Sequence, residues 1–394
     1  MDEPTTVGER IAYYRRGLTQ EVLAGLVGRS AIWLSKVERG ELTLDRISLL
    51  LALANVLKVE PWELMPKLGL PPNGGAPLDP PGGVHAISRA VMTARPPDVE
   101  PPTPEELRAA VEHVTRERFV EGRLEPGVLV VPDVIGASRA AVAENLPGAW
   151  WCLAGAYRVA ASLAGIFGDV KLGWIAAQQA IAAAQQSGDP LMVASAQRRL
   201  AFAFMQEGWL DDALTVCSDG ADAIAPTDDM APEGWSLWGS LQLTGAVAAV
   251  RADDAVAARQ MLRDARSGAE RVGPGRDDYM EGFGPANVAA HEVTAMLELG
   301  DVVEALRIAD TVNLEDLPND ERRATFLIEV AHAHGLRRDD AAAVAAMLEA
   351  EYHAPDMTRY SVLTRELVRM CLSRERRSRT PGLRRLASLI GVTD

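Results

Sequence analysis

Residues 17–40 read GLTQEVLAGLVGRSAIWLSKVERG. Apolar residues recur in this stretch at spacings of three and four on either side of Gly28, which predicts two short helices that share one apolar face. Thr19 and Ser30 carry hydroxyl groups suited to capping the two helix N-termini, and Gly28 can supply the turn between them. The apolar positions are Leu23, Ala24, Val27, Leu34 and Val37.

Helices this short need others to pack against, and residues 10–16 and 47–57 are expected to provide them. Several spaced positions of residues 17–65 then form a recognisable pattern. They are Thr19-Gln20, Leu23-Ala24, Gly28, Ser30, Ser35-Lys36-Val37-Glu38-Arg39-Gly40 and Leu53-Ala54-Asn55-Val56-Leu57-Lys58-Val59. The segment resembles the helix-turn-helix of the lambda-repressor or xenobiotic-response-element (XRE) family. The resemblance implies a domain over residues 1–66 whose second paired helix enters the DNA major groove.

The same resemblance implies DNA contacts for nine side chains. Ala31, Ile32, Ser35 and Lys36 would face the base edges, and Trp33 would lie beside them. Gln20 and Ser30 would hold backbone phosphates, and Arg29 and Arg39 would add electrostatic attraction. The alternative is that Ile32 and Trp33 belong partly to the core and that Arg39 is solvated. Arg15 and Glu38 resemble a buried ion pair between the first helix and the recognition helix. Arg15 stands about two residues closer to the following helix than is usual, which leaves the geometry of this pair open.

Beyond this domain, a high density of Pro and Gly predicts a linker over residues 67–104. Within it, residues 85–94 have the composition of a short helix. Residues 105–394 contain alanine-rich helical segments, and only 5% of the 394 residues are aromatic. Strands prefer β-branched and aromatic residues, so the composition predicts an all-α fold and excludes an all-β one.

Four segments of residues 105–394 resemble the tetratricopeptide repeat, at residues 158–174, 198–214, 292–309 and 329–355. The resemblance implies stacked helical hairpins that form a tetratricopeptide-like α-solenoid, with an irregular interval near 40 residues. A generic helical bundle remains the alternative. Either arrangement buries the apolar face of each helix against its neighbours.

Charge and composition narrow the function. The formal net charge of −15 argues against non-specific coating of nucleic acid, but residues 8–40 hold six basic and three acidic side chains. The separated Cys152, Cys217 and Cys371 indicate neither a disulfide framework nor a zinc site. The N-terminal residues MDEPTTVGERIAYY lack the basic and apolar regions of a secretory signal. The apolar run 148–168 is interrupted by Arg158 and rich in small residues. We therefore expect a cytoplasmic protein, nucleoid-associated when bound to DNA, with no membrane partner.

Reactive groups do not cluster in the sequence, so no enzyme activity, cofactor or metal is predicted. His332 and His334 are two residues apart and point to different faces of a helix, unlike a zinc-binding pair. One arrangement favours ligand binding. Arg158 and Arg198 both lie ten residues before a repeat-ending glycine, Gly168 or Gly208, at the position that lines the concave surface of such repeats. Two guanidinium groups there can converge on a carboxylate or phosphate.

Asn287 falls at another concave position, thirteen residues before Gly300, where its amide could hold a peptide backbone. The alternative is that Arg158 and Arg198 are solvated and that Asn287 is an ordinary residue at a helix start.

The whole chain resembles actinobacterial transcriptional regulators that join this helix-turn-helix to a tetratricopeptide-like domain, similar in layout to the peptide-sensing quorum regulators of Gram-positive bacteria. The resemblance implies a homodimer that binds a palindromic double-stranded DNA operator and senses a peptide or small-molecule effector. The alternative function is a tetratricopeptide-like scaffold for a protein partner, with the DNA module only localising it.

Overall fold

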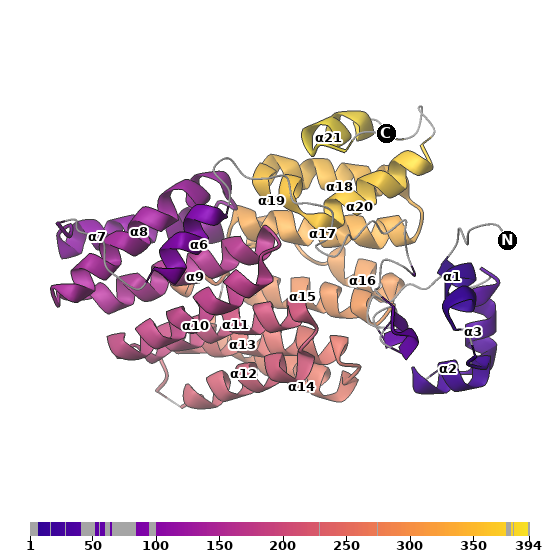
Figure 1. Cartoon of the computed structure of the whole chain (residues 1–394), viewed down its shortest axis with the longest axis horizontal. Coiled ribbons are helices and arrows are strands. Elements are labelled where there is room, and N and C mark those ends of the chain that lie inside the picture. The colour runs from indigo at the N-terminus through magenta and orange to yellow at the C-terminus, as the bar shows by residue number, and fades with distance from the viewer. Residues whose placement is uncertain are drawn as a thin grey trace. The chain divides into compact units, whose positions relative to one another are not determined.

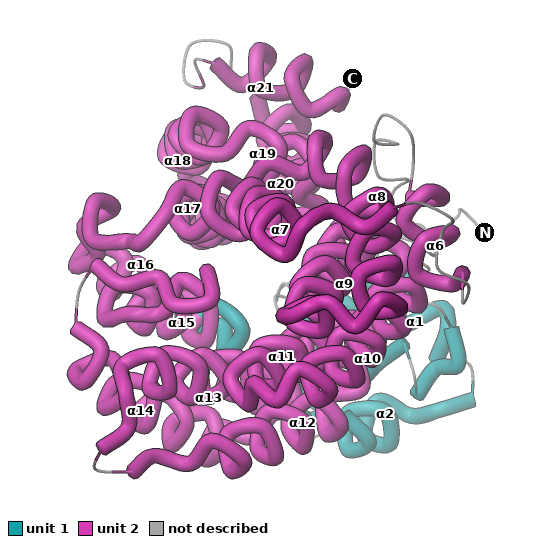
Figure 2. The backbone as a smooth tube through the Cα atoms, turned by 90° about the vertical axis from the view of Figure 1, so that its left-hand side faces the viewer, with its two compact units in different colours: residues 1–76, 297–301 teal, residues 77–296, 302–394 magenta. Residues whose placement is uncertain are grey.

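The computed structural model describes residues 7–15, 17–27, 29–40, 52–54, 56–59, 64, 84–93, 100–227, 229–273, 275–375, 380 and 382–392. Helices supply the regular structure of these residues, and no strand occurs among them (Figure 1). The all-α prediction is confirmed. The chain divides into two compact units, residues 1–76 with 297–301 and residues 77–296 with 302–394 (Figure 2).

The N-terminal unit begins with three short helices, α1 (Val7–Tyr14), α2 (Gln20–Leu26) and α3 (Ala31–Glu38). Thr19 caps α2 by accepting a hydrogen bond from the backbone N–H of Val22, and Ser30 caps α3 in the same way from Trp33. Both predicted caps are confirmed. The predicted turn residue Gly28 lies outside the described residues.

The apolar residues of these helices share one small core, as their spacing predicts. Its fully or almost fully buried members are Ile11, Leu23, Ala24, Leu34, Val37, Leu53, Ala54 and Leu64. Helices of seven or eight residues are marginal alone. Packing on this common core therefore holds them in place.

The larger unit is an array of helices, which we call the body. Its elements are α6 (His85–Met92), α7 (Pro104–Phe119), α8 (Glu125–Ala143), α9 (Ala149–Ile166), α10 (Val170–Ser187), α11 (Pro190–Glu207), α12 (Leu210–Ala223), α13 (Pro232–Arg251), α14 (Ala255–Val272), η2 (Asp278–Met280), α15 (Pro285–Glu298), α16 (Val302–Ala309), η3 (Leu314–Asp316), α17 (Asp320–Leu336), α18 (Asp340–His353), α19 (Pro355–Tyr360), α20 (Val362–Ser373) and α21 (Leu383–Leu389).

From α9 to α18 the body consists of five consecutive helical hairpins (Figure 1). Each hairpin turns through a residue with positive φ, after which the second helix starts. These residues are Gly168, Gly208, Asp253, Gly300 and Arg338. The repeated turn confirms the predicted stacked hairpins.

Two long helices of the body, α8 and α9, are mostly apolar and have 19 and 18 residues. The run 148–168 forms α9, most of whose residues are buried, as predicted. Among the described helices, α8 is long and apolar enough to cross a membrane by length and composition alone, and 44% of its apolar window is buried within the protein. A core helix passes the same test.

Part of the stretch predicted as a linker packs on the body. Ile87 and Val91 of α6 are fully buried in the core that α8, α9 and α10 also form. The Arg139 guanidinium of α8 donates hydrogen bonds to the carbonyl oxygens of Ala90 and Val91. The helix expected over residues 85–94 is therefore present and anchored.

The body also joins its beginning to its end, which the sequence did not predict. The backbone N–H of Glu321 in α17 donates to the carbonyl of Val120 at the end of α7, at 3.0 Å. The N–H of Leu124 donates to the carboxylate of Asp356 in α19, at 2.7 Å. Figure 2 shows α7 near α17, and these two bonds link the segment between α7 and α8 to α17 and α19.

Candidate DNA-recognition helix and buried arginine cluster

The helix α3, predicted to be the recognition helix, has a buried and an outward side. Leu34 and Val37 point into the core, whereas Ile32 is 72% exposed and Lys36, one turn later, is exposed as well. Ala31 and Ser35 are half-buried at the border of this outward side. The structure therefore places the four residues predicted to face base edges along one stripe, since positions four apart lie on the same face of a helix.

Glu38 at the end of α3 ties the three helices together. Its carboxylate accepts hydrogen bonds from Arg15 Nε after α1 and from Gln20 Nε2 of α2, both at 2.6 Å. The predicted ion pair between Arg15 and Glu38 is thus confirmed. The Gln20 amide, predicted to hold a phosphate, donates to Glu38 in this structure.

The remaining predicted DNA-contacting residues lie around the N-terminus and the end of α3. Trp33 is half-buried and packs against the small core. Ser30 is exposed and caps the helix, and Arg29 before it is half-buried. Arg39 is exposed and donates a hydrogen bond to the Ser35 hydroxyl at 3.1 Å.

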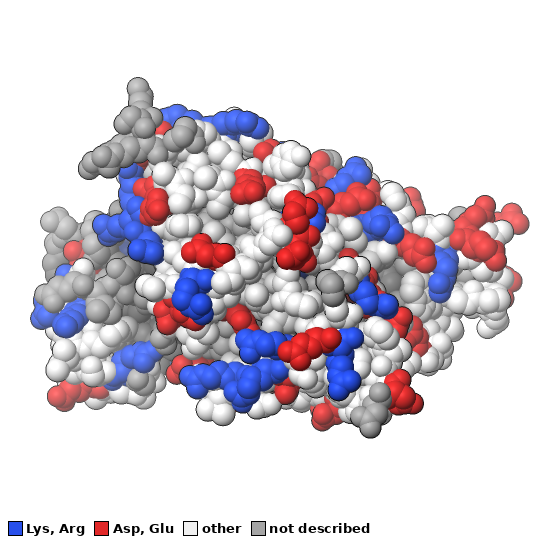
Figure 3. Space-filling view, turned by 180° about the vertical axis from the view of Figure 1, so that it is seen from behind, with Lys and Arg blue, Asp and Glu red and all other residues white. Residues whose placement is uncertain are grey.

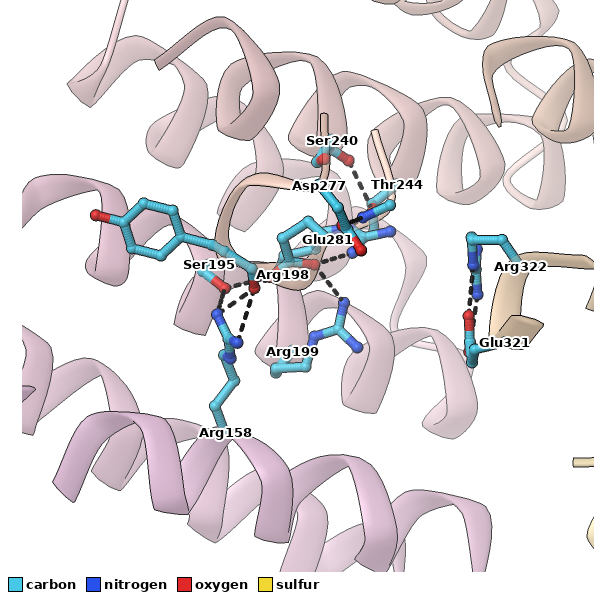
Figure 4. Close-up of polar contacts among 12 residues, drawn as sticks. Arg158, Ser195, Arg198, Arg199, Ser240, Thr244, Asp277, Glu281, Glu321 and Arg322 are labelled. Atoms are coloured by element: carbon cyan, nitrogen blue, oxygen red, sulfur yellow. Dashed lines mark hydrogen bonds and ion pairs between the residues drawn. The ribbon is translucent and has the colours of Figure 1, made fainter. Parts of the chain in front are cut away.

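In the body, Arg158 of α9 and Arg198 of α11 converge on one carboxylate, that of Glu281 (Figure 4). Both arginines are buried, at 2% and 3% exposure. Arg198 forms an ion pair with Glu281 and donates to the Thr244 hydroxyl at 2.9 Å. Arg158 donates to the Ser195 hydroxyl at 2.5 Å, and its Nη1 lies 3.6 Å from Glu281 Oε1.

The sequence prediction found the two arginines but missed Glu281. This residue lies between α14 and α15, where Tyr279 and Met280 adopt positive φ values of 52° and 55° that non-glycine residues rarely take. Asp277 stabilises the turn by accepting hydrogen bonds from the Gly282 N–H and the Asn319 amide. An irregular segment of this kind has no periodicity from which the position of Glu281 could be predicted.

Three further arginines, also missed, lie near this pair. Arg199 of α11 donates to Glu281 Oε2 at 3.2 Å. Arg118 of α7 and Arg322 of α17 flank a second carboxylate, that of Glu321, with N–O distances of 3.4 Å and 2.6 Å. Figure 4 shows the Glu281 and Glu321 groups on either side of one region of the body.

The electrostatics of this region follow from its burial and its excess of arginine. Burial alone would raise the pKa of Glu281, but Arg199, Arg198 and Arg158 outweigh it and hold that pKa at about 2. Burial, together with the neighbouring Arg198 and Arg158, lowers the pKa of Arg199 to about 9 against the attraction of Glu281. Burial and the nearby Arg322 lower the pKa of His291 to about 3, so this imidazole is neutral at pH 7.

Asn287, the third predicted ligand-binding residue, begins α15 and is 2% exposed. Its Nδ2 is buried and has no hydrogen-bond partner among the described residues. Within the residues that the structure describes, the Asn287 side chain forms no hydrogen bond with Arg158 or Arg198. The structure thus brings the two arginines together on the carboxylate of Glu281.

Residues 7–65 match a family of helix-turn-helix domains. No curated protein sequence matches the chain. Among solved structures, the crystal structure of Bacillus thuringiensis PlcR in complex with the peptide PapR7 and DNA is similar with a TM-score of 0.38 and 11% sequence identity. The match covers 85% of this chain and 98% of that chain. The family match confirms the predicted helix-turn-helix at the N-terminus.

Proposed function

We propose that this protein is a sequence-specific DNA-binding transcriptional regulator that acts by binding rather than by catalysis. The outward stripe of α3 carries the proposal, within a domain that matches helix-turn-helix domains. In such domains the second helix of the pair places its N-terminal residues against base edges in the major groove. Lys36 can donate to guanine O6 and N7, and the exposed Ile32 can contact a thymine methyl group.

The charge distribution supports a limited, specific DNA interface. The whole chain has a formal net charge of −15, and on the face drawn in Figure 3 acidic and basic side chains are interspersed. In the described part of the first domain, Arg29, Lys36 and Arg39 lie on or beside α3. The nearby carboxylate of Glu38 accepts hydrogen bonds from Arg15 and Gln20. We propose that Ser30 and the two arginines meet phosphates there.

One recognition helix reads only a short half-site, so we propose that the protein binds a palindromic operator as a homodimer. Residues 1–66 would bind DNA, residues 67–104 would connect, and residues 105–394 would dimerise and sense a peptide or small-molecule effector. The buried arginine cluster supports the sensing role, because guanidinium groups recognise carboxylates and phosphates.

Selection from a randomised DNA pool, followed by gel shifts, tests the proposal. The full chain is expected to enrich one palindromic sequence. Lys36→Glu should weaken binding to it by about 100-fold, because an attraction becomes a repulsion next to phosphates. Lys171→Glu, on the exposed side of α10, makes the same charge change and should bind like the wild type.

Normal operator binding by Lys36→Glu would contradict the assignment of α3. A pool that yields no enriched sequence would instead favour the scaffold function.

A further inference from the structure

A pocket of about 160 Å³ adjoins the buried arginine cluster of the body. Its walls come from α7, α9, α11, α17 and the segment that carries Glu281. The charged side chains that line it are Arg118, Arg198, Arg199, Glu281, Glu321 and Arg322. Its apolar wall includes Phe119, Ile166, Phe202 and Met280. The pocket thus joins a cationic side to an apolar side.

Positive charge exceeds negative charge around this pocket. Four guanidinium groups and two carboxylates line it. The arginines are Arg118, Arg198, Arg199 and Arg322, and the acids are Glu281 and Glu321. An uncompensated buried charge destabilises a protein unless a counter-ion or ligand reaches it. The excess of positive charge therefore favours the binding of an anion in this pocket.

Arg199 is the arginine with the most unused hydrogen-bonding capacity. Its side chain is only 10% exposed, and among the described residues it makes one hydrogen bond, to Glu281. Its Nε is buried without a partner. The guanidinium instead stacks over the rings of Phe119 and Phe202, 5.1 Å and 4.7 Å from their centroids. Stacking leaves the in-plane N–H groups available to an acceptor.

We propose that this pocket binds the anionic head, a carboxylate or a phosphate, of a small organic molecule whose apolar part packs against Phe119 and Phe202. A cavity of about 150 Å³ accommodates a benzene ring, so the buried part of the ligand is of that size. Arg199 and Arg118 donate to the head, while Glu281 and Glu321 stay paired with their own arginines. The inference rests on the proposed function, in which this ligand is the effector.

Calorimetric titration of the full chain without DNA tests the proposal. The probes are benzoate and phenyl phosphate, which distinguish a carboxylate from a phosphate site, and the neutral benzamide. At least one anion is expected to bind saturably, and benzamide at least about tenfold more weakly, because only the anion gains charge-assisted hydrogen bonds. No saturable binding of either anion up to about 10 mM, or equal affinity for benzamide, would overturn the proposal.

Two variants assign the site. Arg199→Gln should weaken binding of the preferred anion at least about tenfold, whereas Arg259→Gln, on the exposed side of α14, should not change it. Phe202→Ala keeps every charge and should weaken benzoate or phenyl phosphate but not inorganic phosphate. If Arg199→Gln does not fold, the Phe202→Ala variant alone tests whether the ligand binds in this pocket. Unchanged affinity in the folded variants would refute the site. The titration contains no DNA, so a failure to bind the anions would not affect the gel-shift evidence for DNA binding. Likewise, a failure in the gel shift would not affect the evidence for anion binding.

Discussion

Replacing Glu281 by glutamine keeps the size of the side chain and removes its charge. Glu281 is 5% exposed and accepts hydrogen bonds from Ser195, Arg198 and Arg199. Breaking a buried ion pair by removing one partner destabilises a protein by roughly 3–5 kcal/mol. The pKa of Glu281 gives a similar value for this destabilisation. It falls from 4.5 to about 2 on folding, and at about 1.4 kcal/mol per pKa unit this corresponds to about 3 kcal/mol. We expect Glu281→Gln to lower the free energy of unfolding by this amount at pH 7.

The effect should depend on pH in one direction. The folded-state pKa of Glu281 is depressed, so its stabilising contribution is complete above the unfolded pKa and is lost as the pH falls toward the folded value. The difference between wild type and variant should therefore be constant above about pH 4.5 and should shrink by about 1.4 kcal/mol per unit below it.

Urea unfolding followed by far-ultraviolet circular dichroism, at pH 7 and at several values below 4.5, measures this difference. Glu349→Gln, on the exposed side of α18, is the matched control and should stay within about 0.5 kcal/mol of wild type. A loss below about 1 kcal/mol for Glu281→Gln at pH 7, or a difference that does not shrink in acid, would refute the structural role of this carboxylate.

Two further predictions concern the separate parts of the chain. In Gly8→Ala the new Cβ would lie 2.2 Å from the carbonyl oxygen of Val37, so we expect roughly 2 kcal/mol of destabilisation or more, seen as faster hydrogen exchange in α1 to α3. Gly25→Ala in α2 meets no atom within 4 Å and should slow exchange instead; similar behaviour of the two variants would contradict the packing of α1 on α3. A fragment of residues 84–394, which includes the anchored α6, should be a dimer by light scattering at micromolar concentration. A monomeric fragment would contradict the proposal that residues 105–394 dimerise.

Local patterns in the sequence predicted local features of the fold. The hydroxyls of Thr19 and Ser30 cap helices, and the breaks at Gly168 and Gly208 are hairpin turns. The hairpin turn at Asp253 has no glycine, and the type of this residue does not predict its positive φ. Capping and turn formation depend on neighbouring residues, so a single sequence contains the information.

Long-range partners could not be predicted in this way. The alignment of repeats placed Arg158 and Arg198 on the same side of neighbouring helices, and the structure shows that they do converge. Their partner Glu281 is far along the chain, and Arg118 meets Glu321 across a still longer separation. No periodicity links such positions, because they meet only through the stacking of all intervening helices.

The burial of the two arginines also changes how a ligand role is tested. Arg158→Ala and Arg198→Ala would each remove a partner of Glu281 and disturb the fold. A lost effector response in such variants would not separate sensing from stability. Arg199 is also a partner of Glu281, but it makes one hydrogen bond where Arg158 and Arg198 each make two. Arg199→Gln therefore removes fewer contacts, and the stability of the variant is measured beside its ligand affinity.

The contact of α7 with α17 and α19 limits how this array can change in length. An open solenoid can gain or lose a hairpin, because each repeat touches only its neighbours. Here an inserted hairpin would carry Val120 away from Glu321 and Leu124 away from Asp356, and both bonds would be lost. The joint therefore fixes the number of hairpins between its two sides, and a longer or shorter version of this body would need different residues at the ends of α7 and α17.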